Sequence, residues 1–231
     1  MNLLALLALG FFLGMRHATD ADHVVAVTTI VSRKRTLAAA LPVGALWGLG
    51  HTLTIVLVGG AVVLFGVVIS PRLGLGMELS VAIMLIVLGA MNVWAFVRDV
   101  PALAHGGSEG HEHGETGASL GVTSLRPLLV GVVHGLAGSA AVALLVLGTI
   151  RDAAWALAYL LVFCTGTIAG MAIITAAMAV PVVAAAERFA RIHRALVVAT
   201  GVASLAFGAA IAYQIGFVHG LFTGHPDWTP Q

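Results

Sequence analysis

Four ionisable side chains lie within seven residues of one another near the start of the chain: His17, Asp20, Asp22 and His23. The sequence around them is apolar and long enough to enter a membrane. Ionisable groups in the hydrocarbon of a bilayer are costly unless they are paired or have a function. Two imidazoles and two carboxylates are ligands that suit a divalent transition metal. The pattern therefore predicts a metal site inside a membrane protein.

The spacing predicts how these side chains share a helix. Each residue of a straight helix advances by about 100°, so His17, Asp20 and His23 lie on one face and Asp22 points elsewhere. If the helix unwinds here, Asp22 either joins the ligands or orients an imidazole. Arg16 is expected to balance Asp20 or Asp22. A structural Arg–Asp–His network without metal is the alternative.

The composition indicates an all-α integral membrane protein. Of 231 residues, 60% are hydrophobic and only 9% are charged, and the mean hydropathy is +1.05. A soluble domain of this size carries far more charge. The net charge of +1 implies no nucleic-acid partner. Cys164 is the only cysteine, which excludes an internal disulfide and a CxxC redox pair.

Hydrophobic runs long enough to cross about 30 Å of hydrocarbon predict six transmembrane helices. Several exceed the required length, so a tilt, kink or break is expected to absorb the excess. We expect a break near residues 14–23, and Pro42, Gly48 and Gly50 are candidates for a second one. The predicted spans are 2–31, 37–69, 77–98, 126–150, 152–181 and 194–222.

The basic residues predict the orientation, because Lys and Arg concentrate in cytoplasmic connections. Eight of them flank the first, third and fifth connections, and only Arg72 and Arg151 lie on the other side. Both termini are therefore expected outside the cytoplasm. The eight residues are Arg33, Lys34, Arg35, Arg98, Arg126, Arg188, Arg191 and Arg194.

The two halves of the chain resemble each other weakly, which predicts two three-helix repeats at 1–98 and 126–222. With three spans each, the halves face opposite ways across the membrane, as in many transporters. The alternative is that glycine-rich apolar helices align easily by chance. A tail follows at 223–231. The matched positions are Gly14 and His17 with Gly131 and His134, Gly50 with Gly166, and Gly89 with Gly208.

The segment 99–125 between the halves is predicted to be a flexible cytoplasmic loop, because it is polar and rich in glycine. His105, His111 and His113 alternate there with glutamates. Such tracts capture metal ions transiently. A solvated linker without a metal function is the alternative.

Two further histidines lie within predicted spans: His51 in the second and His134 in the fourth. Each alone is more typical of a hydrogen-bonded core residue. Imidazoles on three separate spans favour a role as ligands or in a pathway. Weaker candidates for polar contacts along that pathway are Thr52, Asn92 and Ser139.

The types of donor atom restrict which metal ion such a site would bind. Imidazole nitrogen and carboxylate oxygen suit Ni(II), Co(II), Zn(II) or Mn(II). A single cysteine and scattered methionines argue against Cu(I). Sites for Mg²⁺ or Ca²⁺ would use oxygen ligands instead of histidines.

The segment Arg16–His23 resembles the signature of the NiCoT nickel/cobalt transporter family, a histidine, four residues and then Asp-His. Gly50-His51-Thr52 is similar to that family's second histidine motif. The resemblance implies a nickel or cobalt permease. It implies that His17, Asp22 and His23 form the core of the metal site, with His51 as a helper.

The second half departs from the longer family members, which carry Asp-Thr-Ala-Thr-Glu in the corresponding helix. This chain has His134-Gly-Leu-Ala-Gly-Ser139 there. The shorter length and this motif are similar to the compact, urease-accessory (UreH-like) branch. That resemblance implies maturation proteins of nickel enzymes as partners.

The sequence therefore predicts a secondary transporter for Ni(II) or Co(II), importing the ion across a bacterial or archaeal cytoplasmic membrane. No nucleotide-binding motif of the P-loop kind is present. We expect no enzymatic activity and no prosthetic group, with the metal as cargo. The alternatives are efflux of the same metals, a membrane metallochaperone and a membrane-embedded metalloenzyme.

Overall fold

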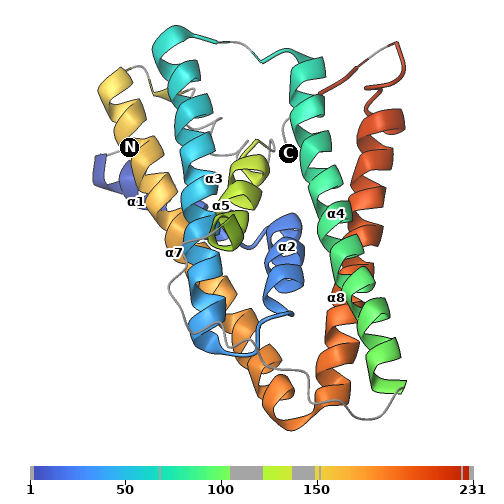
Figure 1. Cartoon of the computed structure of the whole chain (residues 1–231). Helices are drawn as coiled ribbons and strands as arrows, with labels where there is room; N and C mark the ends of the chain where they lie inside the picture. The colour runs from blue at the N-terminus through green and yellow to red at the C-terminus, as the bar shows by residue number, and fades with distance from the viewer. Residues whose placement is uncertain are drawn as a thin grey trace.

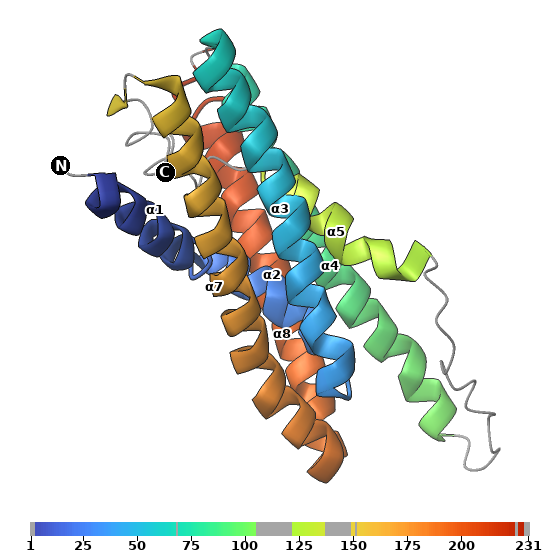
Figure 2. The ribbon, with the colours of Figure 1, turned by 90° about the vertical axis from the view of Figure 1, so that its left-hand side faces the viewer.

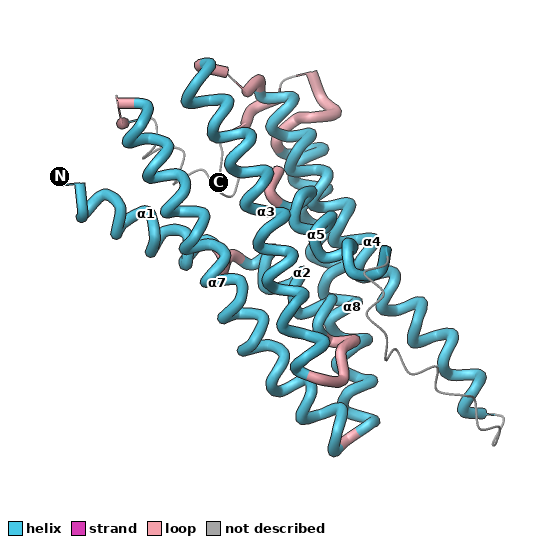
Figure 3. The backbone as a smooth tube through the Cα atoms, turned by 60° about the vertical axis from the view of Figure 1, so that its left-hand side comes forward, coloured by secondary structure: helices cyan, strands magenta, loops and turns pink. Residues whose placement is uncertain are grey.

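In the computed structural model, every regular element within the described part of the chain is a helix, and turns or loops connect the helices (Figures 1 and 3). That part comprises residues 3–67, 69–104, 122–136, 149–150, 152–224 and 226–228. Helices satisfy their own backbone hydrogen bonds, which lipid cannot do. The helices are α1 (Leu3–His17), α2 (Ala21–Val31), α3 (Leu37–Phe65), α4 (Pro71–Ala104), α5 (Val122–His134), α7 (Ala153–Arg188) and α8 (Ala190–Tyr213), which continues as the π-helix η2 (Gln214–Val218).

Among the described residues, four helices are long and apolar enough to cross a membrane: α3, α4, α7 and α8. The prediction of an all-α, multi-pass membrane protein is confirmed at this level. The other two predicted spans, 2–31 and 126–150, contain the shorter apolar helices α1, α2 and α5. Much of the predicted fourth span, residues 137–148, lies outside the described residues.

The predicted break in the first span is present between α1 and α2, at residues 18–20. The second expected break is wrong, because α3 is one uninterrupted helix of 29 residues. Pro42 lies in its second turn without ending the helix. Both ends of the predicted loop 99–125 are helical, since α4 continues to Ala104 and α5 begins at Val122.

Helices α1 and α7 pack so closely that their backbones touch (Figure 2). A Cβ atom on Gly14 would collide with the carbonyl oxygen of Phe163. A Cβ atom on Gly166 would collide in the same way with the carbonyl oxygen of Phe11. Small residues permit such contacts between membrane helices, where dispersion replaces the hydrophobic effect.

Helices α3 and α5 repeat this reciprocal arrangement. A Cβ atom on Gly50 would strike the carbonyl oxygen of Leu128, and one on Gly131 would strike that of Trp47. Thr54 also donates a hydrogen bond of 2.9 Å to the carbonyl oxygen of Val132 on α5. Gly50, a predicted candidate for a break, and Gly131, a predicted repeat position, therefore both serve helix packing.

Helices α4 and α8 form the third closely packed pair, on the right in Figure 1. Gly89 faces the backbone of Gly201 on α8, and Gly208 faces the backbone of Ala82 on α4. Ser204 donates a 2.8 Å hydrogen bond to the carbonyl oxygen of Leu85. The short helix α2 lies in the middle of the bundle and contacts both α7 and α8.

The basic connections gather at one end of the bundle. The α2–α3 connection, the end of α4 and the turn between α7 and α8 lie at the lower end in Figure 1. The α3–α4 connection lies at the upper end. The C-terminal segment returns to that upper end, where Trp228 donates a 2.8 Å hydrogen bond to Glu78 near the start of α4.

Asn92 fixes α4 to the end of α2. Its buried amide donates hydrogen bonds to the carbonyl oxygen of Thr29 (2.8 Å) and to the hydroxyl of Ser32 (3.1 Å). We expect Asn92→Ala to lower the free energy of unfolding by about 1 kcal/mol, as for other hydrogen bonds between membrane helices. Thermal unfolding in detergent measures this loss. Ser80→Ala is the control, since Ser80 bonds only its own helix, and an equal loss in both variants would contradict the assignment.

Candidate metal centre

The break after α1 places two carboxylates beside two imidazoles. Asp20 adopts an extended backbone conformation (φ −61°, ψ 148°) and precedes the first turn of α2. Its N–H donates to the carbonyl oxygen of His17 at 3.1 Å. Its carboxylate lies 2.9 Å from Nδ1 of His17. Asp and Thr readily leave helical geometry to make such local hydrogen bonds, which explains why the helix stops here.

His17 points its other nitrogen at α3. Nε2 of His17 lies 3.0 Å from Nε2 of His51, and both side chains are buried. Two ligands that bind one metal at about 2.1 Å and at right angles are about 3.0 Å apart. The two imidazoles are therefore spaced as adjacent ligands of one ion.

A second set of contacts surrounds Asp22. One carboxylate oxygen lies 3.0 Å from Nδ1 of His23, and the other lies 3.1 Å from Nε2 of His134 on α5. The same Nε2 of His134 is 3.3 Å from Nδ1 of His23. A single carboxylate therefore holds imidazoles from two separate helices.

His23 belongs to both sets. Three donor atoms lie within 4.8 Å of one another, one from each of His17, His23 and His51. The same is true of one donor atom from each of Asp22, His23 and His134. Nδ1 of His23 faces Asp22, whereas its buried Nε2 has no hydrogen-bond partner among the described residues. The ring centroids of His17 and His23 are 4.6 Å apart, so the His23 ring lies beside the first set.

Two helix ends converge on this cluster. Helix α1 ends at His17 and α5 ends at His134. The last carbonyl groups of a helix lack partners within the helix and carry partial negative charge. Broken helices that direct this end toward a bound cation are a feature of transporters. Backbone and side chains thus both favour positive charge here.

Aromatic side chains pack against the histidine cluster. Trp47 lies one turn before His51 on α3, and its ring is 5.5 Å from that of His23 and 5.3 Å from that of His134. Phe163 lies 5.7 Å from His17. Sequence inspection assigned no role to these two residues. The only available signal was the spacing of four between Trp47 and His51, which places both on one helix face.

Some predicted residues lie elsewhere. Arg16 is exposed and forms no ion pair with a described residue, so its expected pairing with Asp20 or Asp22 is wrong. Asn92 binds α2 instead of the histidine cluster. The hydroxyl of Thr52 is buried without a partner among the described residues. Ser139, His105, His111 and His113 lie outside the described residues.

These features define a helical membrane protein in which four buried imidazoles contact one another and two carboxylates. The donor set matches the preference of Ni(II), Co(II) and Zn(II) for nitrogen with some oxygen. One comparison with known proteins places this class more narrowly. The chain is 35% identical over 225 residues to the urease accessory protein UreH of Bacillus sp. (strain TB-90), covering 96% of each chain.

The chain belongs to the UreH branch of the NiCoT family, as its histidine motifs predicted. This membership places it among membrane transport proteins and not among enzymes. No family model matches the chain. No solved structure matches it either.

Proposed function

We propose that this protein imports Ni(II) or Co(II) across the cytoplasmic membrane of a bacterium or archaeon. The observation that supports this most strongly is the cluster of four histidines buried between apolar helices, with two carboxylates bound to them. The histidines are His17, His23, His51 and His134. Imidazoles crowded at 3.0 to 3.3 Å need a shared proton or a shared cation. A transition-metal dication satisfies all of them together.

The two sets of ligands support movement of the ion in steps. The first site uses His17, His51 and Nε2 of His23. The second uses Asp22, His134 and Nδ1 of His23. Because His23 belongs to both sites, the ion passes between them by moving from one ring nitrogen of His23 to the other. It keeps protein ligands throughout this step. Conduction requires this kind of binding at several sites, none of them too tight.

The helix pairs support two inverted repeats, 1–98 and 126–222, as the moving units. The pairing of α1 with α7 through Gly14 and Gly166 parallels the pairing of α5 with α3 through Gly131 and Gly50. These are the positions that the two halves share in sequence. Rocking of the halves around a central site would expose the cluster to each side in turn.

The membrane potential suffices to drive import. With the basic connections in the cytoplasm, a dication moves inward down the potential. Two charges crossing 100 mV gain about 4.6 kcal/mol, and no ATP is needed. Export would need coupling to an opposing gradient. The released ion would go to maturation proteins of nickel enzymes, which the name of the relative suggests.

Flux into proteoliposomes tests this function. Purified protein is reconstituted, a negative interior potential is imposed, and uptake of radioactive Ni(II) is followed. We expect potential-driven uptake that His17→Ala reduces to the level of empty vesicles. His193→Ala is the matched control, because His193 is also buried but lies on α8 outside the cluster. Unchanged uptake in His17→Ala would overturn the proposal.

Deletion of the gene distinguishes import from export. Cells without an importer starve for nickel and lose nickel-enzyme activity, which added nickel restores. Cells without an exporter become sensitive to nickel. The second phenotype would contradict the proposed direction while leaving the metal site intact.

The two carboxylates are expected to differ in importance. Asp22→Asn removes the charge that holds both His23 and His134, and we expect nickel affinity to fall by about 10- to 100-fold. The Asp20 carboxylate bonds His17 alone among the described residues, and its side chain is more than a third exposed. Asp20→Asn should therefore lower nickel affinity by less than about tenfold. Titration of purified protein with Ni(II) measures both, and the reverse order of effects would contradict the second site.

A further inference from the structure

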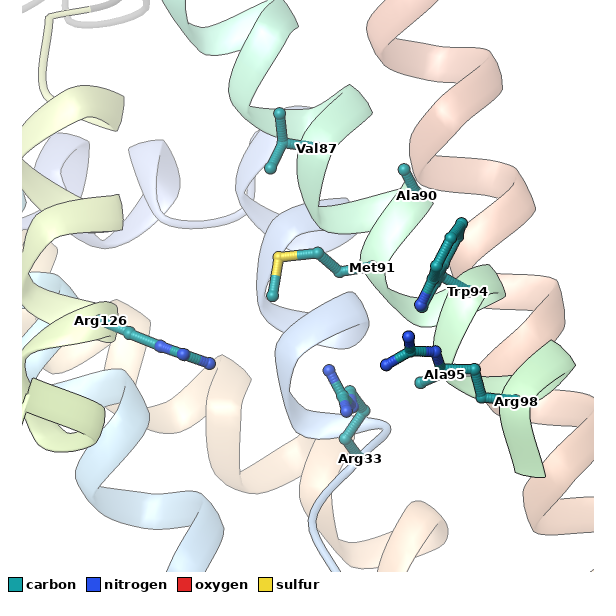
Figure 4. Close-up of a pocket in the computed structure, with 8 residues that line it drawn as sticks. All are labelled: Arg33, Val87, Ala90, Met91, Trp94, Ala95, Arg98 and Arg126. Atoms are coloured by element: carbon teal, nitrogen blue, oxygen red, sulfur yellow. The ribbon is translucent and has the colours of Figure 1, made fainter. Parts of the chain in front are cut away.

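A cavity of about 610 Å³ lies away from the histidine cluster, between the end of α2, the second half of α4 and the start of α5. Arg33, Arg98 and Arg126 line it, one from each of these segments. Figure 4 shows their guanidinium groups pointing into the space between the helices. Three separate parts of the chain thus converge to supply positive charge.

Within the described part of the chain, no carboxylate pairs with this charge. None of the three arginines forms an ion pair with a described residue. A second cavity of about 310 Å³ shares Arg33 and Arg126 and adds Lys34. Four cations around two neighbouring cavities repel a metal dication and attract an anion.

The wall along α4 indicates what kind of anion fits. Val87, Met91 and Trp94 succeed one another on the lining face of α4, and all three are exposed. Arg98 follows one turn later, with its guanidinium carbon 5.2 Å above the Trp94 ring. In membrane proteins, apolar residues contact acyl chains, tryptophan lies at the interface, and arginine binds headgroup phosphates. The residues along α4 follow this order.

We propose that this cavity binds an anionic phospholipid, with its phosphate between the three arginines and its acyl chains along α4. The site is separate from metal transport and does not depend on it. Basic pockets between membrane helices on the cytoplasmic side bind anionic headgroups, and the predicted orientation places this cavity on that side. A free phosphate ion would use the arginines but would gain nothing from the apolar wall.

Quenching of Trp94 by brominated lipids tests the site. The protein is placed in bilayers containing increasing fractions of brominated phosphatidylglycerol or brominated phosphatidylcholine. The Trp94 signal is the difference from Trp94→Phe, which removes the contributions of the other tryptophans. We expect half-quenching at about a tenfold lower fraction of the anionic lipid. Each arginine replaced by glutamine should reduce this preference by up to about fivefold.

The variants are Arg98→Gln and the triple change Arg33→Gln/Arg98→Gln/Arg126→Gln. The matched control is Arg191→Gln, an exposed arginine on α8 that does not line the cavity. We expect the preference to fall in Arg98→Gln, to vanish in the triple variant and to persist in Arg191→Gln. If the triple variant does not fold, Arg98→Gln decides, because Arg98 is exposed and its loss leaves no cavity in the core.

Three results would overturn the proposal. The first is equal quenching by both lipids in the wild-type protein. The second is an equal loss of preference in Arg98→Gln and Arg191→Gln, which would indicate general surface attraction. The third is release of the quenching by millimolar inorganic phosphate, which would assign the arginines to the free ion.

Discussion

Replacing His23 by alanine is expected to abolish nickel transport and to weaken nickel binding at least 100-fold. His23 is the only residue that belongs to both groups of ligands. Its loss therefore damages both sites, whereas loss of His51 or His134 damages one. Changes to residues that merely orient ligands cost about 10- to 100-fold in affinity, and loss of a shared ligand should cost at least as much. Calorimetric titration of purified protein with Ni(II) measures the effect.

The matched control for this variant is again His193→Ala, which removes a buried imidazole 170 positions away on α8 and should bind nickel like the wild type. Thermal unfolding without metal shows whether His23→Ala is folded. A folded His23→Ala protein with wild-type affinity would remove His23 from the site. Equal losses in His23→Ala and His193→Ala would point to damaged packing instead.

Replacing Gly50 by valine is expected to prevent the folded bundle from forming. Its Cβ would collide with the Leu128 carbonyl oxygen, and a backbone atom cannot move aside as a side chain can. Overpacking a core commonly costs about 1–3 kcal/mol, and a backbone collision should exceed that range. Separation of α5 from α3 would also move His134 away from Asp22. The fraction of monodisperse protein after extraction in mild detergent reports the outcome.

Gly60 provides the control on the same helix. A Cβ atom on Gly60 meets nothing within 4 Å, so Gly60→Val should fold and bind nickel normally. A monodisperse, nickel-binding Gly50→Val protein would contradict the close packing of α3 and α5. Aggregation of both variants would attribute the effect to valine in this helix and not to the contact.

Much of the candidate site could be predicted from the sequence, because ionisable residues are rare in membrane helices and therefore conspicuous. His17, Asp20, Asp22, His23, His51 and His134 were all selected on that basis, and the structure brings them together. The arrangement could not be predicted. Asp22 and His23 are neighbours in the first turn of α2, where helical spacing alone separates them by about 100°. The sequence does not show that the Asp22 carboxylate nevertheless contacts His23, or that α5 brings His134 to the same carboxylate.

The two errors have different physical causes. Arg16 was expected to pair with a nearby aspartate because opposite charges adjacent in sequence attract. Imidazoles contact both carboxylates instead, and Arg16 remains exposed. Pro42, Gly48 and Gly50 were candidates for a break because both residue types disfavour helices. Tertiary packing reverses that preference in α3, where Gly50 allows α5 to approach.

The fold was predictable to the level of apolar helices and their approximate limits, since length and hydropathy determine which segments can cross a bilayer. Which helices pair was not predictable from hydropathy, because every apolar face is equally compatible with lipid. The glycines carry that information, but only in three dimensions does Gly14 prove to face α7 and Gly131 to face α3.

X-ray absorption at the nickel edge of the purified, nickel-loaded protein tests the central claim most directly, because it reports the atoms bound to the ion. We predict a shell of nitrogen and oxygen ligands with the multiple scattering of at least two imidazole rings and no sulfur, and we predict that His23→Ala loses imidazole scattering. A spectrum of hydrated nickel, or one that His23→Ala leaves unchanged, would contradict the claim that the buried histidine cluster binds the transported ion.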